Sequence, residues 1–216
     1  MRQLSKILFF IFICFLLASP TAFPAIKGGV KYNIPIDYSK LSENELKEKA
    51  REYYFNALLV EDKMINENIT NALFLYSVLS NVNPESVEYP VKLGVLYDKL
   101  GKDRHAKSNF SKAISINSNS PLPYYYFAEY YYKREMYRKA LKCYVEAYKR
   151  GYEKNYDLLY RMGDIYEKFG DTRSALIYLR EANSQNPNPE LENKIKYIEN
   201  FDSINREFYS DTRIRG

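Results

Sequence analysis

Apolar and small residues recur every three or four positions from residue 43 onward, with charged residues between them. The first such stretch predicts a helix over about residues 43–64, because these spacings place side chains on one helical face. Ser42 followed by Glu45 forms a capping box, so we expect this helix to begin there. The recurring positions are Leu46, Ala50, Tyr53, Ala57, Val60 and Met64.

One pattern then occurs three times along the chain. A small residue is followed three positions later by a tyrosine and nine positions after that by an alanine. Successive copies begin 34 and 35 residues apart, which is the sequence signature of a repeat architecture. The three copies are Gly94, Tyr97 and Ala106; Ala128, Tyr131 and Ala140; and Gly163, Tyr166 and Ala175.

Each copy predicts two helices that cross at close range. The glycine or alanine on the first helix and the alanine on the second let the two backbones approach, and the tyrosine fills the groove beside them. Gly101 and Gly170 lie at the same position of the predicted turn between the helices. Glycine adopts the left-handed conformation of a helix C-cap without steric cost, so we expect a sharp turn there.

Each unit resembles the tetratricopeptide repeat (TPR), a helix-turn-helix unit of 34 residues. The resemblance covers about residues 53–188 and implies an all-α fold, a TPR helix-turn-helix solenoid with a C-terminal capping helix. It places three repeats at residues 87–120, 121–154 and 155–188. The glycines, alanines and tyrosines of the pattern are then the repeat core.

The flanking segments continue the helical pattern less regularly. Residues 42–86 are interpreted as an N-terminal helix pair, a degenerate TPR in which either Val60 or Ala57 takes the small-residue position. Residues 189–209 predict one more amphipathic helix, which would shield the last repeat from solvent as terminal repeats require. Residues 210–216 are interpreted as a tail.

The first 25 residues resemble an export signal. Arg2 and Lys6 precede an apolar run, Ile7 to Ala18, which is the length of a signal-peptide core and too short to span a bilayer as a helix. The segment is either cleaved or retained as an anchor, and a lipoprotein attached through Cys14 is a third interpretation. We therefore expect a periplasmic or cell-envelope location, with residues 26–41 as an extended linker.

Composition argues for a folded, non-catalytic chain. Hydrophobic residues make up 46% of the sequence, which is enough for a core. A net charge of +5, interleaved with acids, does not indicate nucleic-acid binding. His105 has no second histidine or cysteine partner nearby, and Cys143 is the only cysteine outside the signal. We therefore expect no catalytic residues, no metal and no cofactor.

Tyrosine is the unusual residue, with 23 in the chain. Seven aromatic residues lie within residues 124–132, and one helix face cannot bury all of them. The TPR resemblance implies a concave groove lined by the first helices of the repeats, and exposed aromatic patches tend to mark binding sites. Projected onto this chain, the groove combines tyrosines with acids: Tyr125, Glu129, Tyr132, Tyr160, Asp164 and Glu167.

The groove and the export signal together suggest a function. The resemblance implies a protein–protein interaction scaffold or adaptor of the bacterial envelope, working within an outer-membrane assembly, a secretion system or a periplasmic flagellar-motor structure. We expect the partner to be an apolar protein segment with basic flanks. The alternative is a cell-wall or glycan-binding envelope protein that uses the same tyrosine-rich groove.

Overall fold

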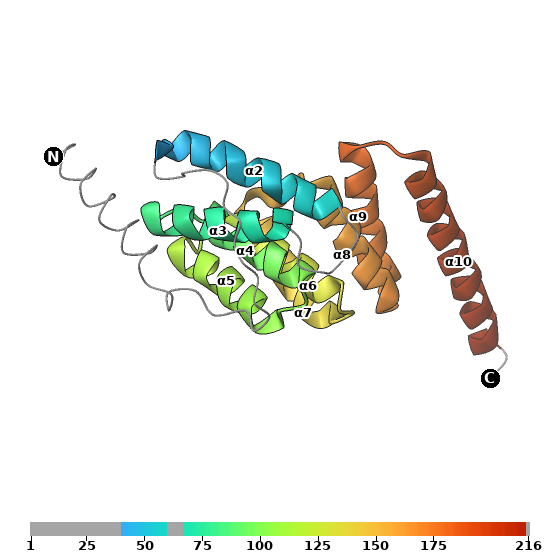
Figure 1. Cartoon of the computed structure of the whole chain (residues 1–216). Helices are drawn as coiled ribbons and strands as arrows, with labels where there is room; N and C mark the ends of the chain where they lie inside the picture. The colour runs from blue at the N-terminus through green and yellow to red at the C-terminus, as the bar shows by residue number, and fades with distance from the viewer. Residues whose placement is uncertain (1–39, 60–66, 215–216) are drawn as a thin grey trace. The chain divides into compact units, whose positions relative to one another are not determined.

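The computed structural model describes residues 40–59 and 67–214, with side chains described as far as Phe201. Helices account for all the regular secondary structure in this part of the chain, which confirms the all-α prediction (Figure 1). The α-helices are α2 (Glu43–Leu59), α3 (Glu67–Val82), α4 (Glu88–Lys99), α5 (Asp103–Ile116), α6 (Pro121–Tyr132), α7 (Tyr137–Ala147), α8 (Tyr156–Lys168), α9 (Thr172–Gln185) and α10 (Pro189–Ile214).

The chain divides into two compact units, the first ending at Ile116 and the second beginning at Asn117. In the first unit α2 packs on α3 and α4 on α5. In the second unit α6 packs on α7 and α8 on α9, and α10 adds to α9. The pairs α4–α5, α6–α7 and α8–α9 are each a helix-turn-helix, so the predicted architecture of the repeats is present within each unit.

Side-chain caps begin helices α2, α8 and α9. The Ser42 amide donates to the Glu45 carboxylate over 2.7 Å, and the Glu45 amide donates to the Ser42 hydroxyl over 3.3 Å, which confirms the predicted capping box of α2. Asn155 and Asp171 cap α8 and α9 by accepting hydrogen bonds from Leu158 and Ser174 amides. Such caps satisfy amide groups that a helix leaves without an internal partner.

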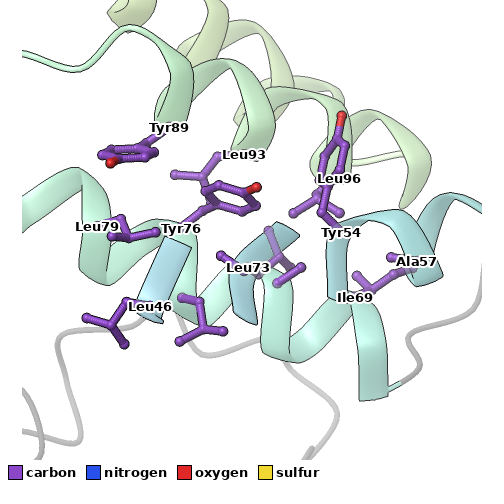
Figure 2. Packing of buried hydrophobic residues seen from close by; sticks show 13 residues of the cluster. Leu46, Tyr54, Ala57, Ile69, Leu73, Tyr76, Leu79, Tyr89, Leu93 and Leu96 are labelled. Atoms are coloured by element: carbon purple, nitrogen blue, oxygen red, sulfur yellow. The ribbon is translucent and has the colours of Figure 1, made fainter. Parts of the chain in front are cut away.

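The core of the first unit is built around three tyrosine rings, shown in Figure 2. The ring centroid of Tyr76 lies 5.8 Å from that of Tyr54 and 6.2 Å from that of Tyr89. On α2 the structure buries Tyr54, whereas the sequence pattern placed Tyr53 on the apolar face. The two positions fit the helical period almost equally, and contact with Tyr76 decides between them. Ala57 is fully buried, while Val60 and Met64 lie outside the described residues.

Close packing explains the small residues of the repeats. A Cβ atom added to Gly163 would lie 2.6 Å from the side chain of Leu179 on α9, and one added to Gly94 would lie 2.6 Å from the ring of Phe110 on α5. Real Cβ atoms do not approach other atoms so closely, so glycine sets the spacing of each helix pair. The alanines of the pattern are completely buried: Ala106, Ala128, Ala140 and Ala175.

The turn inside each repeat uses a left-handed residue at equivalent positions. Gly101 has φ 66° and Gly170 has φ 75°, as expected of C-cap glycines. In the repeat between them the position is taken by Glu135, with φ 56°. This is the single described non-glycine residue with positive φ, and L-residues adopt that conformation at a cost of about 1–2 kcal/mol.

A π-helical turn, Tyr148–Tyr152, follows α7 and contains Gly151 with φ 110°. A π turn holds more residues than an α turn, so it accommodates one extra residue. It lies between the second and third copies of the repeat pattern, which are 35 residues apart. The insertion is therefore taken up in the connection between repeats and not in either helix of the crossing.

Helix α10 closes the second unit. Its residues Leu191, Ile195 and Ile198 are buried in one cluster with Leu159 of α8 and Leu179 of α9. The sequence predicted a capping helix over residues 189–209, and the helix runs to Ile214. Within the described ranges, no helix combines the length and the apolar character needed to cross a bilayer.

Candidate protein-binding site on helices α6 and α8

The predicted groove residues lie on the first helices of the two repeats in the second unit. Tyr125, Tyr132 and Tyr160 are half-buried, so each presents part of its ring to solvent. Tyr125 is held by ring contacts from three directions, with centroids 5.3 Å, 6.2 Å and 5.8 Å from those of Tyr126, Tyr144 and Tyr152. These contacts fix the orientation of the aromatic surface before any partner arrives.

Glu129 on α6 is paired within the unit. Its carboxylate accepts a hydrogen bond from the Tyr144 hydroxyl of α7 and lies 3.4 Å from the guanidinium Nε of Arg161 on α8. The Arg161 guanidinium also lies 4.4 Å from the ring centroid of Tyr132. An arginine over an aromatic face gains a cation–π attraction in addition to its ion pair. Arg161 therefore binds an acid and a tyrosine of the preceding first helix.

Asp164 on α8 has three partners. The Tyr132 hydroxyl of α6 donates to its Oδ2 over 2.5 Å, and the ammonium groups of Lys168 and Lys194 lie 3.6 Å and 3.5 Å from its oxygens. Its side chain is only 14% exposed. These donors replace the water that burial removes from the carboxylate.

Lys194 brings α10 into the same arrangement. Its ammonium lies 2.8 Å from the carboxylate of Glu167 and 5.4 Å from the ring centroid of Tyr160, in addition to its contact with Asp164. Lys194 thus contacts an acid and a tyrosine of α8, as Arg161 contacts an acid and a tyrosine of α6. The two cations are 33 residues apart. We call each group of a cation with the acid and tyrosine of the preceding first helix a clasp.

The clasps change the electrostatics expected of the groove. The sequence predicted a groove that combines tyrosines with acids, and in the structure Glu129, Asp164 and Glu167 each have a cation within ion-pair distance. Their side chains are 18%, 14% and 38% exposed, so Glu167 is the acid most open to solvent. Arg161 and Lys194 are not among the predicted groove residues, although their 33-residue spacing, close to the repeat length, is a visible signal of a shared role.

Titration behaviour reflects this packing. Burial, with the hydrogen bond to Asp164, raises the pKa of Tyr132 to about 12. Burial also raises the pKa values of Tyr125 and Tyr144, with the charge of Glu129 adding to the effect. For Lys194 burial alone would lower the pKa, but the hydrogen bond and charge of Glu167 outweigh it and raise the pKa overall. Tyr125 and Tyr132 are therefore neutral hydrogen-bond donors at physiological pH.

The predicted core tyrosines are half-buried, and each contacts another aromatic residue. The ring centroid of Tyr97 lies 5.0 Å from that of the exposed His105, and the ring of Tyr166 stacks on that of Tyr178 at 5.5 Å. Tyr131 stacks on Phe127 at 4.6 Å. In the same aromatic run the structure buries Tyr130 almost completely, at 3% exposed.

The described residues contain no group of three or more histidine, cysteine, aspartate or glutamate side chains placed to hold a metal ion. Cys143 is a half-buried free thiol on α7, and burial raises its pKa to about 11. A thiol with so high a pKa is a weak nucleophile at neutral pH, because the thiolate is the reactive form.

Comparison with known sequences identifies the repeats. The sequence profile of the tetratricopeptide repeat family matches residues 91–120 and 156–189, which are the first and third copies of the pattern. The chain therefore contains tetratricopeptide repeats in these two segments. A TPR repeat-containing protein of Methanocaldococcus jannaschii is 27% identical over 146 residues. That match covers 64% of this chain and 26% of the relative, so the chain spans about a quarter of the relative's length.

Solved structures share the fold. MamA is 18% identical with a TM-score of 0.54, over 77% of this chain and 90% of MamA. PilF of Pseudomonas aeruginosa is 16% identical with a TM-score of 0.58, over 77% of this chain and 76% of PilF. PilW, a type IV pilus biogenesis factor, is 17% identical with a TM-score of 0.56, over 67% of this chain and 62% of PilW.

The presence of tetratricopeptide repeats indicates what kind of ligand the site binds. Tetratricopeptide repeats are protein-interaction scaffolds that bind protein partners, and the family is generally non-catalytic. The first helices of the repeats are α6 and α8 in the second unit, and they carry the half-buried tyrosines and the clasps. The protein therefore offers a rigid aromatic surface with charges that are already balanced.

Proposed function

We propose that this protein is a non-catalytic scaffold of the bacterial cell envelope that holds a partner protein along the first helices of its second unit. The observation that carries the proposal is the row of half-buried rings of Tyr125, Tyr132 and Tyr160. Ring contacts and clasps fix these tyrosines, so little side-chain freedom is lost when a partner covers them. Aromatic anchors of this kind supply most of the energy in protein interfaces.

The clasps refine the chemistry of the partner. An apolar segment would cover the tyrosine rings, and its basic flanks would meet Glu167 first because that carboxylate is the most exposed of the three. Glu129 and Asp164 are enclosed and already paired, so they contribute to the shape of the surface more than to its charge. Binding should therefore depend on salt only modestly, since few net charges change partners.

Site-specific photo-crosslinking in envelope fractions tests the proposal. A crosslinking residue at position 160 should capture one dominant protein, whereas the same residue at Ile177, exposed on α9, should not. Tyr160→Ala should reduce capture from a second crosslinker at position 132 by tenfold or more on the scale of interface anchors. Equal capture from positions 160 and 177 would remove the groove from consideration. Sedimentation of the protein with purified peptidoglycan would instead favour the glycan-binding alternative.

Envelope placement is a separate part of the proposal and is supported by the basic residues and apolar run of residues 1–18, which lie outside the described residues. A fusion of residues 1–30 to a reporter that is active only outside the cytoplasm should be active. Replacing Phe12 and Phe15 with Asp should abolish the signal, because each central charge costs about 2.5–3.5 kcal/mol on insertion scales. An unchanged reporter would contradict export, without bearing on the groove.

A further inference from the structure

The two helix-turn-helix turns of the second unit lie side by side and expose large apolar side chains. Met136, in the turn between α6 and α7, is 38% exposed, and Phe169, in the turn between α8 and α9, is 45% exposed. Lys168 precedes Phe169, and Tyr137 follows Met136. The ammonium of Lys168 lies 5.5 Å from the ring centroid of Tyr137, so the two turns are in contact. We call the surface formed by Met136, Phe169 and the adjoining charged residues the turn edge.

The turn edge is strongly basic. Residues 133–142 contain five cations and one acid, in a chain whose charges are otherwise well mixed. Arg138, Lys139 and Lys142 are exposed on α7, and Lys168 adds a cation from the next turn. The acids that face this edge are the exposed Glu135; Asp171, whose carboxylate caps α9; and Asp164, which pairs with Lys168 at 3.6 Å. The local balance remains positive.

Neither the core nor the groove accounts for this arrangement. The buried residues of α7 are Ala140, Tyr144 and Ala147, so Arg138 and Lys142 point away from the helix pair. Phe169 directly follows the last residue of α8 and does not belong to the buried clusters of this unit, being 45% exposed. Exposed apolar side chains on an edge that also carries exposed cations suit a flat anionic surface, because a bilayer needs no complementary groove.

We propose that the turn edge docks on an anionic phospholipid bilayer, with Phe169 and Met136 entering the interface and the cations meeting the headgroups. Clusters of four to eight basic residues bind anionic lipid surfaces, and apolar side chains beside them deepen the contact. The proposal does not rest on partner binding in the groove, which lies on α6 and α8. Docking would hold the scaffold at a membrane while the tyrosine surface stays accessible.

The absence of tryptophan from the chain makes a direct test available. Phe169→Trp in the full chain places a single fluorescent reporter at the turn edge. With vesicles of phosphatidylcholine and phosphatidylglycerol, its emission should shift to the blue and be quenched by brominated lipid. The control Ile177→Trp, at an exposed position on α9, should do neither, even if residues 1–18 also insert. No shift at position 169, or equal shifts at both positions, would overturn the proposal.

Matched charge reversals test the role of the cations. Arg138→Glu with Lys142→Glu in the Phe169→Trp chain should raise the lipid concentration for half-maximal shift by about tenfold or more. Lys149→Glu with Lys154→Glu makes the same change in net charge beyond the other end of α7, and it should leave the midpoint within about twofold. Equal effects, an equal shift with pure phosphatidylcholine, or a blue shift with soluble polyglutamate would each contradict anionic bilayer docking; the last would point to an acidic protein partner.

Discussion

The hydroxyl of Tyr132 donates a 2.5 Å hydrogen bond to Oδ2 of Asp164, joining the first helices of two successive repeats. Tyr132 also carries Arg161 on its ring face at 4.4 Å. One side chain therefore takes part in both the ion-pair and the aromatic contacts between α6 and α8. Because the contact joins helices of different repeats, it fixes their relative position along the second unit.

Removing this hydroxyl should weaken the second unit. Tyr132→Phe keeps the ring under Arg161 and deletes one hydrogen bond to a charged acceptor, a contact worth about 1.5–3 kcal/mol. Asp164 retains Lys168 and Lys194, so we expect the loss to fall near the lower end of that range. Urea unfolding followed by circular dichroism would measure it. Unchanged stability would mean that the hydrogen bond contributes nothing in solution.

The same substitution should alter stability at high pH. The pKa of Tyr132 is raised to about 12 in the fold, against about 10 in an unfolded chain, so folding favours the neutral phenol. Its contribution is complete below pH 10 and is lost as the pH rises from about 10 to 12. The stability advantage of the wild type over Tyr132→Phe should therefore shrink across this window. A constant difference between the two proteins would contradict the assignment.

Gly163→Ala tests the close packing of α8 on α9 through the sign of the change in the free energy of unfolding. Alanine normally stabilises a helix interior by about 0.5–1 kcal/mol over glycine. At position 163 the added Cβ would meet the side chain of Leu179 at 2.6 Å and the carbonyl oxygen of Ala175 at 3.3 Å. Overpacking of this kind costs about 1–3 kcal/mol, so we expect Gly163→Ala to lower the free energy of unfolding.

An exposed position on α7 provides the control. Lys142→Ala removes a solvated side chain and should change the free energy of unfolding by less than about 0.5 kcal/mol. Thermal unfolding of both variants under one buffer condition is sufficient. Stabilisation by Gly163→Ala would show that α8 and α9 can separate at little cost, contrary to the close packing described above.

Replacing Glu135 with glycine should stabilise the protein. Its φ of 56° is unfavourable for a side chain, and the equivalent turns use Gly101 and Gly170. We expect Glu135→Gly to stabilise the protein by about 0.5–1 kcal/mol, since relief of strain exceeds the extra freedom of glycine in the unfolded chain. Gly170→Ala should act in the opposite direction, because nothing crowds its Cβ and only its φ of 75° is strained. Chemical denaturation of the pair would check both signs.

The helices could be predicted because their determinants are local. The capping residues of α2, the left-handed glycines and the small residues at helix crossings each carry a spacing signal in the sequence. The choice between Tyr53 and Tyr54 was not local, since it depends on where Tyr76 lies on α3. The 35-residue spacing revealed an insertion, but only the backbone shows that it is a π turn with Gly151.

The charges of the candidate site were the least predictable part. Glu129, Asp164 and Glu167 could be placed on one face of the first helices from the repeat register. Whether an acid faces solvent or a cation depends on how consecutive first helices cross and on how far a lysine or arginine reaches. Arg161 and Lys194 are long, flexible side chains, so their partners followed only from the packed structure.

The position of Lys194 on α10 bears on the choice of protein fragments for binding studies. A fragment ending before Pro189 would retain every repeat and still lose the ammonium that neutralises Glu167 and contacts Asp164. Such a fragment would expose two carboxylates beside the ring of Tyr160 and should bind lysine-rich peptides more tightly than the longer chain does. It would also uncover the apolar surface that Leu191 and Ile195 cover. Any self-association of the fragment would then result from the truncation and would not represent the full chain.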